Sequence, residues 1–166
     1  MKKILTLFAV VGLIAFSSCE GPEGPPGEPG PVPYVFEVTT DFAGPNYEKI
    51  VSLQGMLSGD VALVYELVGT NGGDRWALLP QIYYFNDGLE TAQYNFNFSS
   101  NQATIFIDGS LDPAGLPSSF RLGKTFRIVI VPSDFLTSKK TKSDYLDYNA
   151  VIKKYNIDDS NVKKLN

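Results

Sequence analysis

Residues 91–99 read Thr-Ala-Gln-Tyr-Asn-Phe-Asn-Phe-Ser, a stretch in which polar and apolar side chains alternate without a break. A β-strand sends successive side chains to opposite faces of its sheet, so a period of two separates an apolar face from a polar one. The stretch therefore predicts a strand of an antiparallel sheet that packs on one side and meets water on the other.

Further short runs rich in Val, Ile, Phe and Tyr lie on both sides of this stretch, separated by Gly, Asn, Asp or Pro. They predict a mainly all-β fold, an antiparallel two-sheet β-sandwich, for which an immunoglobulin-like outline is one form. The connection over 109–123 is long enough to cross between the two sheets. The predicted strands are Tyr34–Thr40, Glu48–Gln54, Val61–Val68, Arg75–Phe85, Thr91–Ser99, Ala103–Asp108 and Thr125–Val131.

Some of these runs do not alternate in this simple way. Val61–Val68 is apolar on both faces except for Glu66, and Thr125–Val131 has a similar pattern, so both are expected in the middle of a sheet. Pro80 interrupts Arg75–Phe85 and cannot donate a ladder hydrogen bond, which predicts a bulge or an edge position.

One C-terminal helix is expected over about 143–156, with Asp144 and Asp147 in its first turn and two lysines, Lys153 and Lys154, in its last. The tail from Asp158 is charged and is expected to be frayed. We expect one side of the helix to pack on the sandwich, because apolar residues recur there at helical spacing. These residues are Tyr145, Tyr148, Ile152 and Tyr155.

The 166-residue chain has a formal net charge of -4, contains no histidine and has a single cysteine. An acidic surface disfavours nucleic acid as a partner, because binding to phosphates needs clustered Lys and Arg. Without histidine the chain has neither the commonest general base nor the usual zinc ligands. No nucleotide-binding glycine motif follows a predicted strand. We therefore expect no enzymatic activity, no cofactor and no metal.

The N-terminus has the composition of an export signal. Lys2 and Lys3 precede an apolar run, Ile4–Phe16, that is shorter than the ~20 residues of a transmembrane helix. Cys19, the only cysteine, follows this run and has no partner for an internal disulfide.

Phe16-Ser17-Ser18-Cys19 resembles the lipobox of bacterial lipoproteins. The resemblance implies that residues 1–18 are a signal peptide and that Cys19 carries the lipid, whose acyl chains contribute ~0.8 kcal/mol per buried CH₂. With Glu20 next in the chain, it also implies an outer-membrane lipoprotein exposed at the cell surface. The alternative is an ordinary signal peptide with a cysteine there by chance.

Residues 21–32 form four Gly-X-Y triplets, and Pro33 follows them. This collagen-like run predicts a stiff polyproline II tether over 19–33, ahead of a sandwich domain over 34–166, with trimerisation as the alternative. A lipidated cysteine followed by such triplets resembles a group of Bacteroidetes surface lipoproteins, a resemblance that implies no biochemical activity.

Candidate ligand-binding residues lie in the predicted sandwich. The acids of 86–90 and 108–112 could form Asx turns, bind calcium or supply catalytic carboxylates. Trp76, Tyr83 and Tyr84 could form an aromatic platform for a glycan or an envelope protein, or belong to the core. We predict a lipid-anchored, non-enzymatic binding or structural module; the alternative is a glycan-binding or carboxylate-dependent glycan-active domain.

Overall fold

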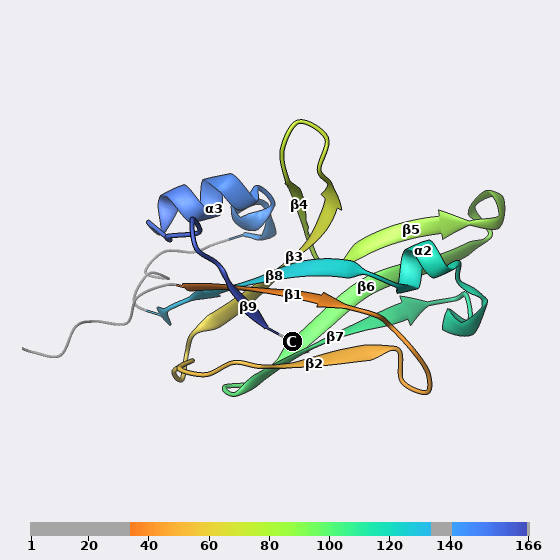
Figure 1. The fold of residues 1–166 in the computed structure, drawn as a ribbon, viewed down its shortest axis with the longest axis horizontal. Helices are drawn as coiled ribbons and strands as arrows, with labels where there is room; N and C mark the ends of the chain where they lie inside the picture. The colour runs from red at the N-terminus through yellow and green to blue at the C-terminus, as the bar shows by residue number, and fades with distance from the viewer. Residues whose placement is uncertain (1–33, 134–140, 166) are drawn as a thin grey trace, which may run out of the picture. The chain divides into compact units, whose positions relative to one another are not determined.

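The computed structural model describes residues 34–133 and 141–165, which form two β-sheets with a helical segment against one of them (Figure 1). The predicted antiparallel sandwich with a C-terminal helix is confirmed. The predicted signal peptide, Cys19 and the tether lie outside the described residues. No helix within the described ranges has the length and apolar character that a membrane span needs.

Five strands in the order β4-β3-β8-β1-β9 form one sheet, which we call sheet A. β3 and β8 lie inside it, as their two-sided apolar sequences predict. In an immunoglobulin constant domain the first strand pairs with the second, whereas here β1 pairs with β8 and β9. The bounds are Arg75–Leu78 (β4), Val61–Gly69 (β3), Lys124–Val131 (β8), Tyr34–Thr40 (β1) and Lys163–Leu165 (β9).

Four strands in the order β2-β7-β6-β5 form the other sheet, sheet B. β6 and β7 form the hairpin that the alternating stretch predicts, and Ala92 and Tyr94 of β6 are buried between the sheets. At the end of β7, a Cβ on Gly109 would lie 2.3 Å from the Thr91 carbonyl oxygen, so this close approach requires glycine. The bounds are Glu48–Ser52 (β2), Gln102–Gly109 (β7), Glu90–Phe98 (β6) and Gln81–Phe85 (β5).

The single strand predicted over Arg75–Phe85 is wrong. The chain leaves sheet A after Leu78 and enters sheet B at Gln81, so Pro80 lies at a corner between β4 and β5. Proline has no N–H for the ladder, whereas Leu79 still donates its N–H to the Val64 carbonyl oxygen at 2.8 Å. The predicted edge position is confirmed twice, because β4 and β5 are each the edge strand of their sheet.

The connection from β7 to β8 crosses from sheet B to sheet A, as predicted, and holds two short helical turns, η2 (Pro113–Gly115) and α2 (Ser118–Arg121). Phe120 of α2 closes one end of the core, where its ring stacks on Tyr94 at a centroid distance of 4.6 Å. The Tyr94 hydroxyl donates to the Phe120 carbonyl oxygen, which fixes α2 over the core. Another short turn, η1 (Asn86–Gly88), connects β5 to β6.

The predicted helix over 143–156 is two pieces, η4 (Lys142–Tyr145) and α3 (Tyr148–Lys154). Asp147 separates them with a non-helical φ of -94° and ψ of 110°. Its carboxylate accepts from the Ala150 N–H at 3.2 Å. It is thus an N-cap, not a first-turn residue, because a capping carboxylate satisfies an N–H that has no partner inside the helix.

The predicted packing of this helix on the sandwich is confirmed. Tyr148, Val151 and Tyr155 are buried against the outer face of sheet A, which includes Tyr65 and Val129 (Figure 1). The Tyr65 hydroxyl also donates a hydrogen bond to the carbonyl oxygen of Tyr145 in η4 at 2.8 Å. The segment formed by η4 and α3, which we call the cover, is therefore held on sheet A by both apolar burial and a hydrogen bond.

The expectation of a frayed tail is wrong. β9 adds to the edge of sheet A in parallel with β1, with Lys164 opposite Glu37. Upstream of β9, Asp159 accepts from the Tyr148 hydroxyl at 2.9 Å. The tail is ordered because its charged residues meet polar and oppositely charged groups on α3 and sheet A.

Candidate functional site

The three aromatic residues singled out by the sequence lie in three different environments. Trp76 of β4 is partly buried against the apolar cluster under α3, and Tyr83 of β5 packs against the core between the sheets. Tyr84 lies on the outside of sheet B and is 71% exposed. The structure does not bring the three together, because strand alternation sends Tyr83 and Tyr84 to opposite faces.

The outer face of sheet B carries a surface that we call the amide face. Its middle is formed by β6, whose outward side chains are Thr91 and three partly or fully exposed amides, with β7 and β5 on either side. Register places Gln93 beside Ile82, Asn95 beside Phe106 and Asn97 beside Thr104. The amide face consists of Ile50, Ile82, Tyr84, Gln93, Asn95, Asn97, Thr104 and Phe106.

The amide face retains unused hydrogen-bonding groups. Gln93 donates to Asp108 at 3.1 Å, and Asn95 accepts from the backbone N–H of Phe96 at 2.9 Å. Within 34–133 and 141–165, no hydrogen bond engages the side chains of Asn97 and Thr104 or the hydroxyl of Tyr84. An amide or hydroxyl both donates and accepts, so this surface can bind a ligand that does the same.

Three of the acids in the two candidate loops, Glu90, Asp108 and Asp112, accept hydrogen bonds from residues close to them in sequence. Asn86 donates to Glu90, Asp108 accepts from the Gly109 N–H at 2.8 Å, and Asp112 accepts from the Ala114 N–H at 2.9 Å. Both bonds of Asp108 and Asp112 are local side-chain-to-backbone contacts, and the Asp112 bond, which reaches two residues on, is that of an Asx turn. Among the described residues, no three His, Cys, Asp or Glu side chains are grouped so that they could hold a metal ion.

One carboxylate is buried between the sheets. Glu66 of β3 is 0% exposed, accepts from the Tyr83 hydroxyl at 2.7 Å and lies 3.1 Å from the Lys124 ammonium. Burial raises the pKa of Glu66, against the opposing effects of Tyr83 and Lys124. Burial and the bond to Glu66 raise the pKa of the Tyr83 hydroxyl. Both oxygens of Glu66 face protein partners, so this cluster joins sheet A to sheet B and has no exposed oxygen for a ligand.

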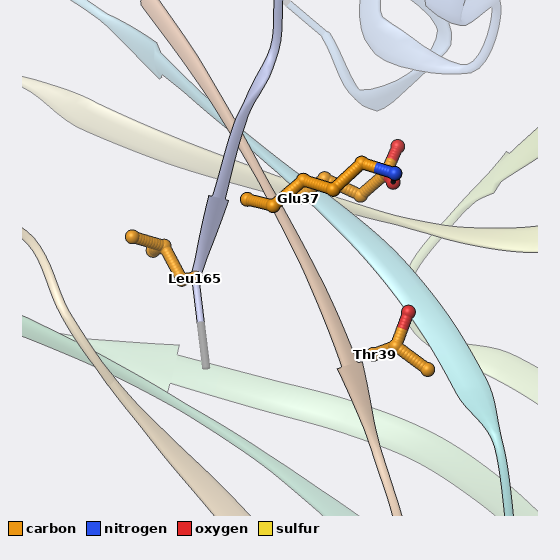
Figure 2. Close-up of a pocket in the computed structure, with 4 residues that line it drawn as sticks. Glu37, Thr39 and Leu165 are labelled. Atoms are coloured by element: carbon orange, nitrogen blue, oxygen red, sulfur yellow. Dashed lines mark ion pairs between the residues drawn. The ribbon is translucent and has the colours of Figure 1, made fainter.

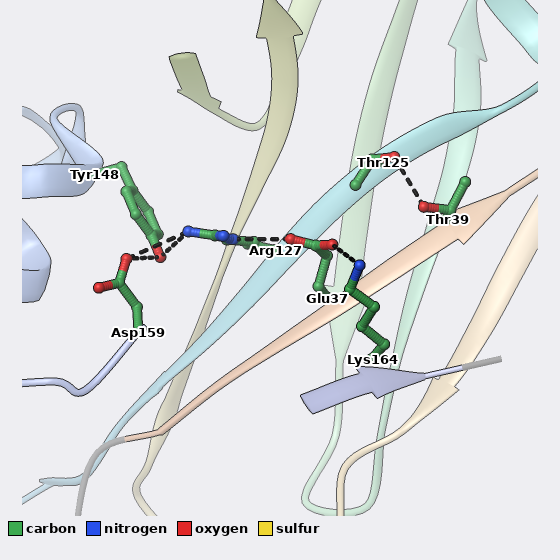
Figure 3. A network of polar contacts seen from close by, with 7 residues as sticks. All are labelled: Glu37, Thr39, Thr125, Arg127, Tyr148, Asp159 and Lys164. Carbon is green, nitrogen blue, oxygen red and sulfur yellow. Dashed lines mark hydrogen bonds and ion pairs between the residues drawn. The ribbon is translucent and has the colours of Figure 1, made fainter. Parts of the chain in front are cut away.

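A second polar cluster lies on the outer face of sheet A (Figure 3). The Arg127 guanidinium is 3.1 Å from Glu37, donates to the Tyr148 hydroxyl at 2.8 Å and lies 3.3 Å from Asp159. It also lies 4.4 Å from the Trp76 ring centroid, a cation–π distance. These contacts join β8 to β1, β4, α3 and the segment before β9. Burial lowers the pKa of Arg127, but Tyr148 and Glu37 outweigh burial and the net pKa is raised.

A small pocket opens beside this cluster, at the β1–β9 edge (Figure 2). Glu37, Thr39, Lys164 and Leu165 line it, and its volume is about 190 Å³. Ligand pockets usually measure ~300–1,000 Å³, so this one is small. Lys164 already lies 3.8 Å from Glu37, and the neighbouring Thr39 hydroxyl bonds to Thr125 at 2.8 Å. The polar groups here thus mainly hold the C-terminal strand.

Sequence reasoning did not single out Arg127 or Asp159, and it noted Glu66 only as an exception in an apolar strand. An isolated charge in a two-sided apolar run is the available signal, because a buried charge needs a partner. That signal indicates that a partner exists but not which one, since Tyr83 and Lys124 come from different strands.

Comparisons of the chain with protein-family models, curated proteins and solved structures find no match in any of the three. The amide face, the Glu66 cluster and the Arg127 cluster are therefore the features from which a function can be proposed.

Proposed function

We propose that this chain is a lipid-anchored binding module at the surface of the outer membrane, without enzymatic activity, and that it binds its ligand on the amide face. The observation that carries the proposal is the contrast between the two outer faces. α3 packs on sheet A, whereas the amide face keeps Tyr84, Ile82 and Ile50 exposed.

The use of polar groups supports binding at this face. Glu66 binds both Tyr83 and Lys124, and Arg127 binds Glu37 and Tyr148. The amide face is different, because the side chain of Asn97 has no partner among the described residues. Polar side chains on a rigid sheet that have no partner within the described residues can bind a ligand without first breaking contacts in the protein.

The anchor is tested by Cys19→Ser in the full chain. The parent should incorporate an alkyne analogue of palmitate and sediment with membranes, and the variant should do neither. The reason is that acylation needs the thiol and that membrane retention needs the acyl chains. Membrane retention of an unlabelled Cys19→Ser protein would contradict the anchor.

The binding surface is tested by photo-cross-linking in living cells. A benzophenone amino acid placed at Tyr84 should give an adduct of raised mass under ultraviolet light. The same group placed at Leu146, an exposed residue between η4 and α3, is the control and should give none. No adduct at 84, or equal adducts at 84 and 146, would contradict the amide face as the binding surface.

A further inference from the structure

We infer that the ligand of the amide face is an uncharged polysaccharide chain that lies across β5, β6 and β7. This inference rests on the proposed function and names the ligand class for the same surface. Three properties of the face lead to it: its charge, the position of its apolar residues and the hydrogen-bonding groups between its two aromatic rings.

The charge of the face disfavours polyanions. No outward position of the four strands of sheet B is Lys or Arg, and the two outward residues that are charged at neutral pH, Glu48 and Asp108, are acidic. Nucleic acids and acidic polysaccharides need positive groups opposite their phosphates or carboxylates. An uncharged ligand does not need positive groups on the surface that binds it.

The position of the apolar residues disfavours a protein partner. Ile50 lies on one edge strand, and Ile82 and Tyr84 lie on the other. Of the two inner strands, β6 contributes amides and β7 contributes Thr104 and one apolar side chain, Phe106, whereas the centre of a protein interface is usually its most apolar part. A protein docked here would desolvate amides for which it must supply a matching set of partners.

The arrangement of rings and amides suits a sugar chain. Tyr84 and Phe106 lie on the strands to either side of β6, with Gln93 and Asn95 on the strand between them. Each ring can pack against the C–H face of a sugar, while the amides exchange hydrogen bonds with its hydroxyls. The register places Tyr84 opposite Thr91 and Phe106 opposite Asn95, so the two rings lie on a diagonal across β6, and a chain that contacts both also passes Gln93.

The test is co-sedimentation of the full chain, purified in mild detergent, with insoluble polysaccharides. The neutral probes are curdlan, insoluble xylan and granular starch, and a calcium polygalacturonate gel is the acidic probe. We expect binding to at least one neutral probe and none to polygalacturonate. Tyr84→Ala should weaken that binding about tenfold, and Leu146→Ala, the matched exposed control, should leave it unchanged.

The outcomes separate the two proposals. Failure of all neutral probes, with a specific cross-link still formed at residue 84 in cells, overturns the ligand class and leaves the binding surface standing. Failure of both experiments overturns both. Equal binding by the parent and Tyr84→Ala would show that the polysaccharide binds at another surface. As the folding control, Tyr84→Ala should unfold at the same urea midpoint as the parent.

Discussion

The outer faces of the two sheets differ in what lies over them. On sheet A, Tyr65, Leu78 and Val129 are buried beneath or beside α3, and on sheet B the amides of Asn95 and Asn97 stay partly or fully exposed. The strands themselves differ in the same way, because β3 and β8 are apolar on both faces and β6 alternates. A strand that is apolar on both faces thus indicates that a further element covers its sheet.

The covered face also shows how a charge is accommodated beneath a cover. Arg127 lies among Glu37, Asp159, Tyr148 and Trp76, so its burial is offset by ion pairs, a hydrogen bond and a ring contact. The amide face, on which none of the described elements packs, needs no such network, since its polar groups are partly or fully exposed. Substitutions should therefore have large effects under α3 and small effects on the amide face.

The largest effect is expected at the centre of the cover. Val151 of α3 is 0% exposed, and Val151→Asp would bury a carboxylate without a partner. The free energy of unfolding should fall by ~4 kcal/mol or more, measured by urea unfolding. A loss below ~1 kcal/mol would show that α3 detaches from sheet A at little cost.

A smaller effect is expected from the charge network of the covered face. Arg127→Met keeps most of the packing on Trp76, leaves Asp159 without its cation and leaves Glu37 with Lys164 alone. Stability should fall by ~1–2 kcal/mol, less than for a fully buried pair because Asp159 is partly exposed. The matched control is Arg75→Met, an exposed arginine of the edge strand β4, which should change stability by less than ~0.5 kcal/mol. Equal losses for the two variants would contradict a special role for the network.

A pH-dependent effect is expected inside the sandwich, on the side of β3 that faces away from the cover. The pKa of Glu66 is raised by burial, so the folded state holds the proton more tightly than the unfolded state. Its contribution to stability is present below its usual value of 4.5 and is lost as pH rises through the raised pKa.

The variant for this test is Glu66→Gln, which keeps an acceptor for Tyr83 and cannot titrate. The stability of the parent relative to this variant should fall as pH rises above 4.5, measured by urea unfolding at each pH. A relative stability that rises with pH would mean that the pairing with Lys124 outweighs burial.

The smallest effect is expected on the amide face. Ile82→Asp adds a charge at an exposed position of the edge strand β5, so stability should change by less than ~0.5 kcal/mol. The same urea experiment compares it directly with Val151→Asp. A loss of several kcal/mol would mean that another element covers this face.

Predictions from local periodicity succeeded in the sandwich. Tyr34–Thr40 was predicted with the bounds of β1, and the 91–108 hairpin forms β6 and β7. The pattern of a strand is visible in one segment, because its side chains alternate whatever the partner strand is. Local reasoning failed at Pro80, where one apolar run contains two strands that belong to different sheets.

Pairings between distant segments could not be predicted in this way. β9 is only Lys-Lys-Leu, and it is a strand because the edge of β1 is open and Glu37 lies opposite Lys164. For the candidate site, the expectation that neighbouring aromatic residues form one platform was wrong, since Tyr83 packs against the core and Tyr84 is exposed. The polar side of β6 was predicted, but not which residues of β5 and β7 would lie beside it.

The sequence by itself determined the fold class, the two-sided character of β3 and β8, the alternating character of β6 and the apolar stripe of α3. All of these are periodicities within one segment, set by backbone geometry. The lipid anchor at Cys19 remains a prediction from the sequence. Only the tertiary structure decided that α3 and β9 join sheet A, and that no element within residues 34–133 and 141–165 packs on the amide face. That choice depends on charges and apolar surfaces that meet only when distant segments pack.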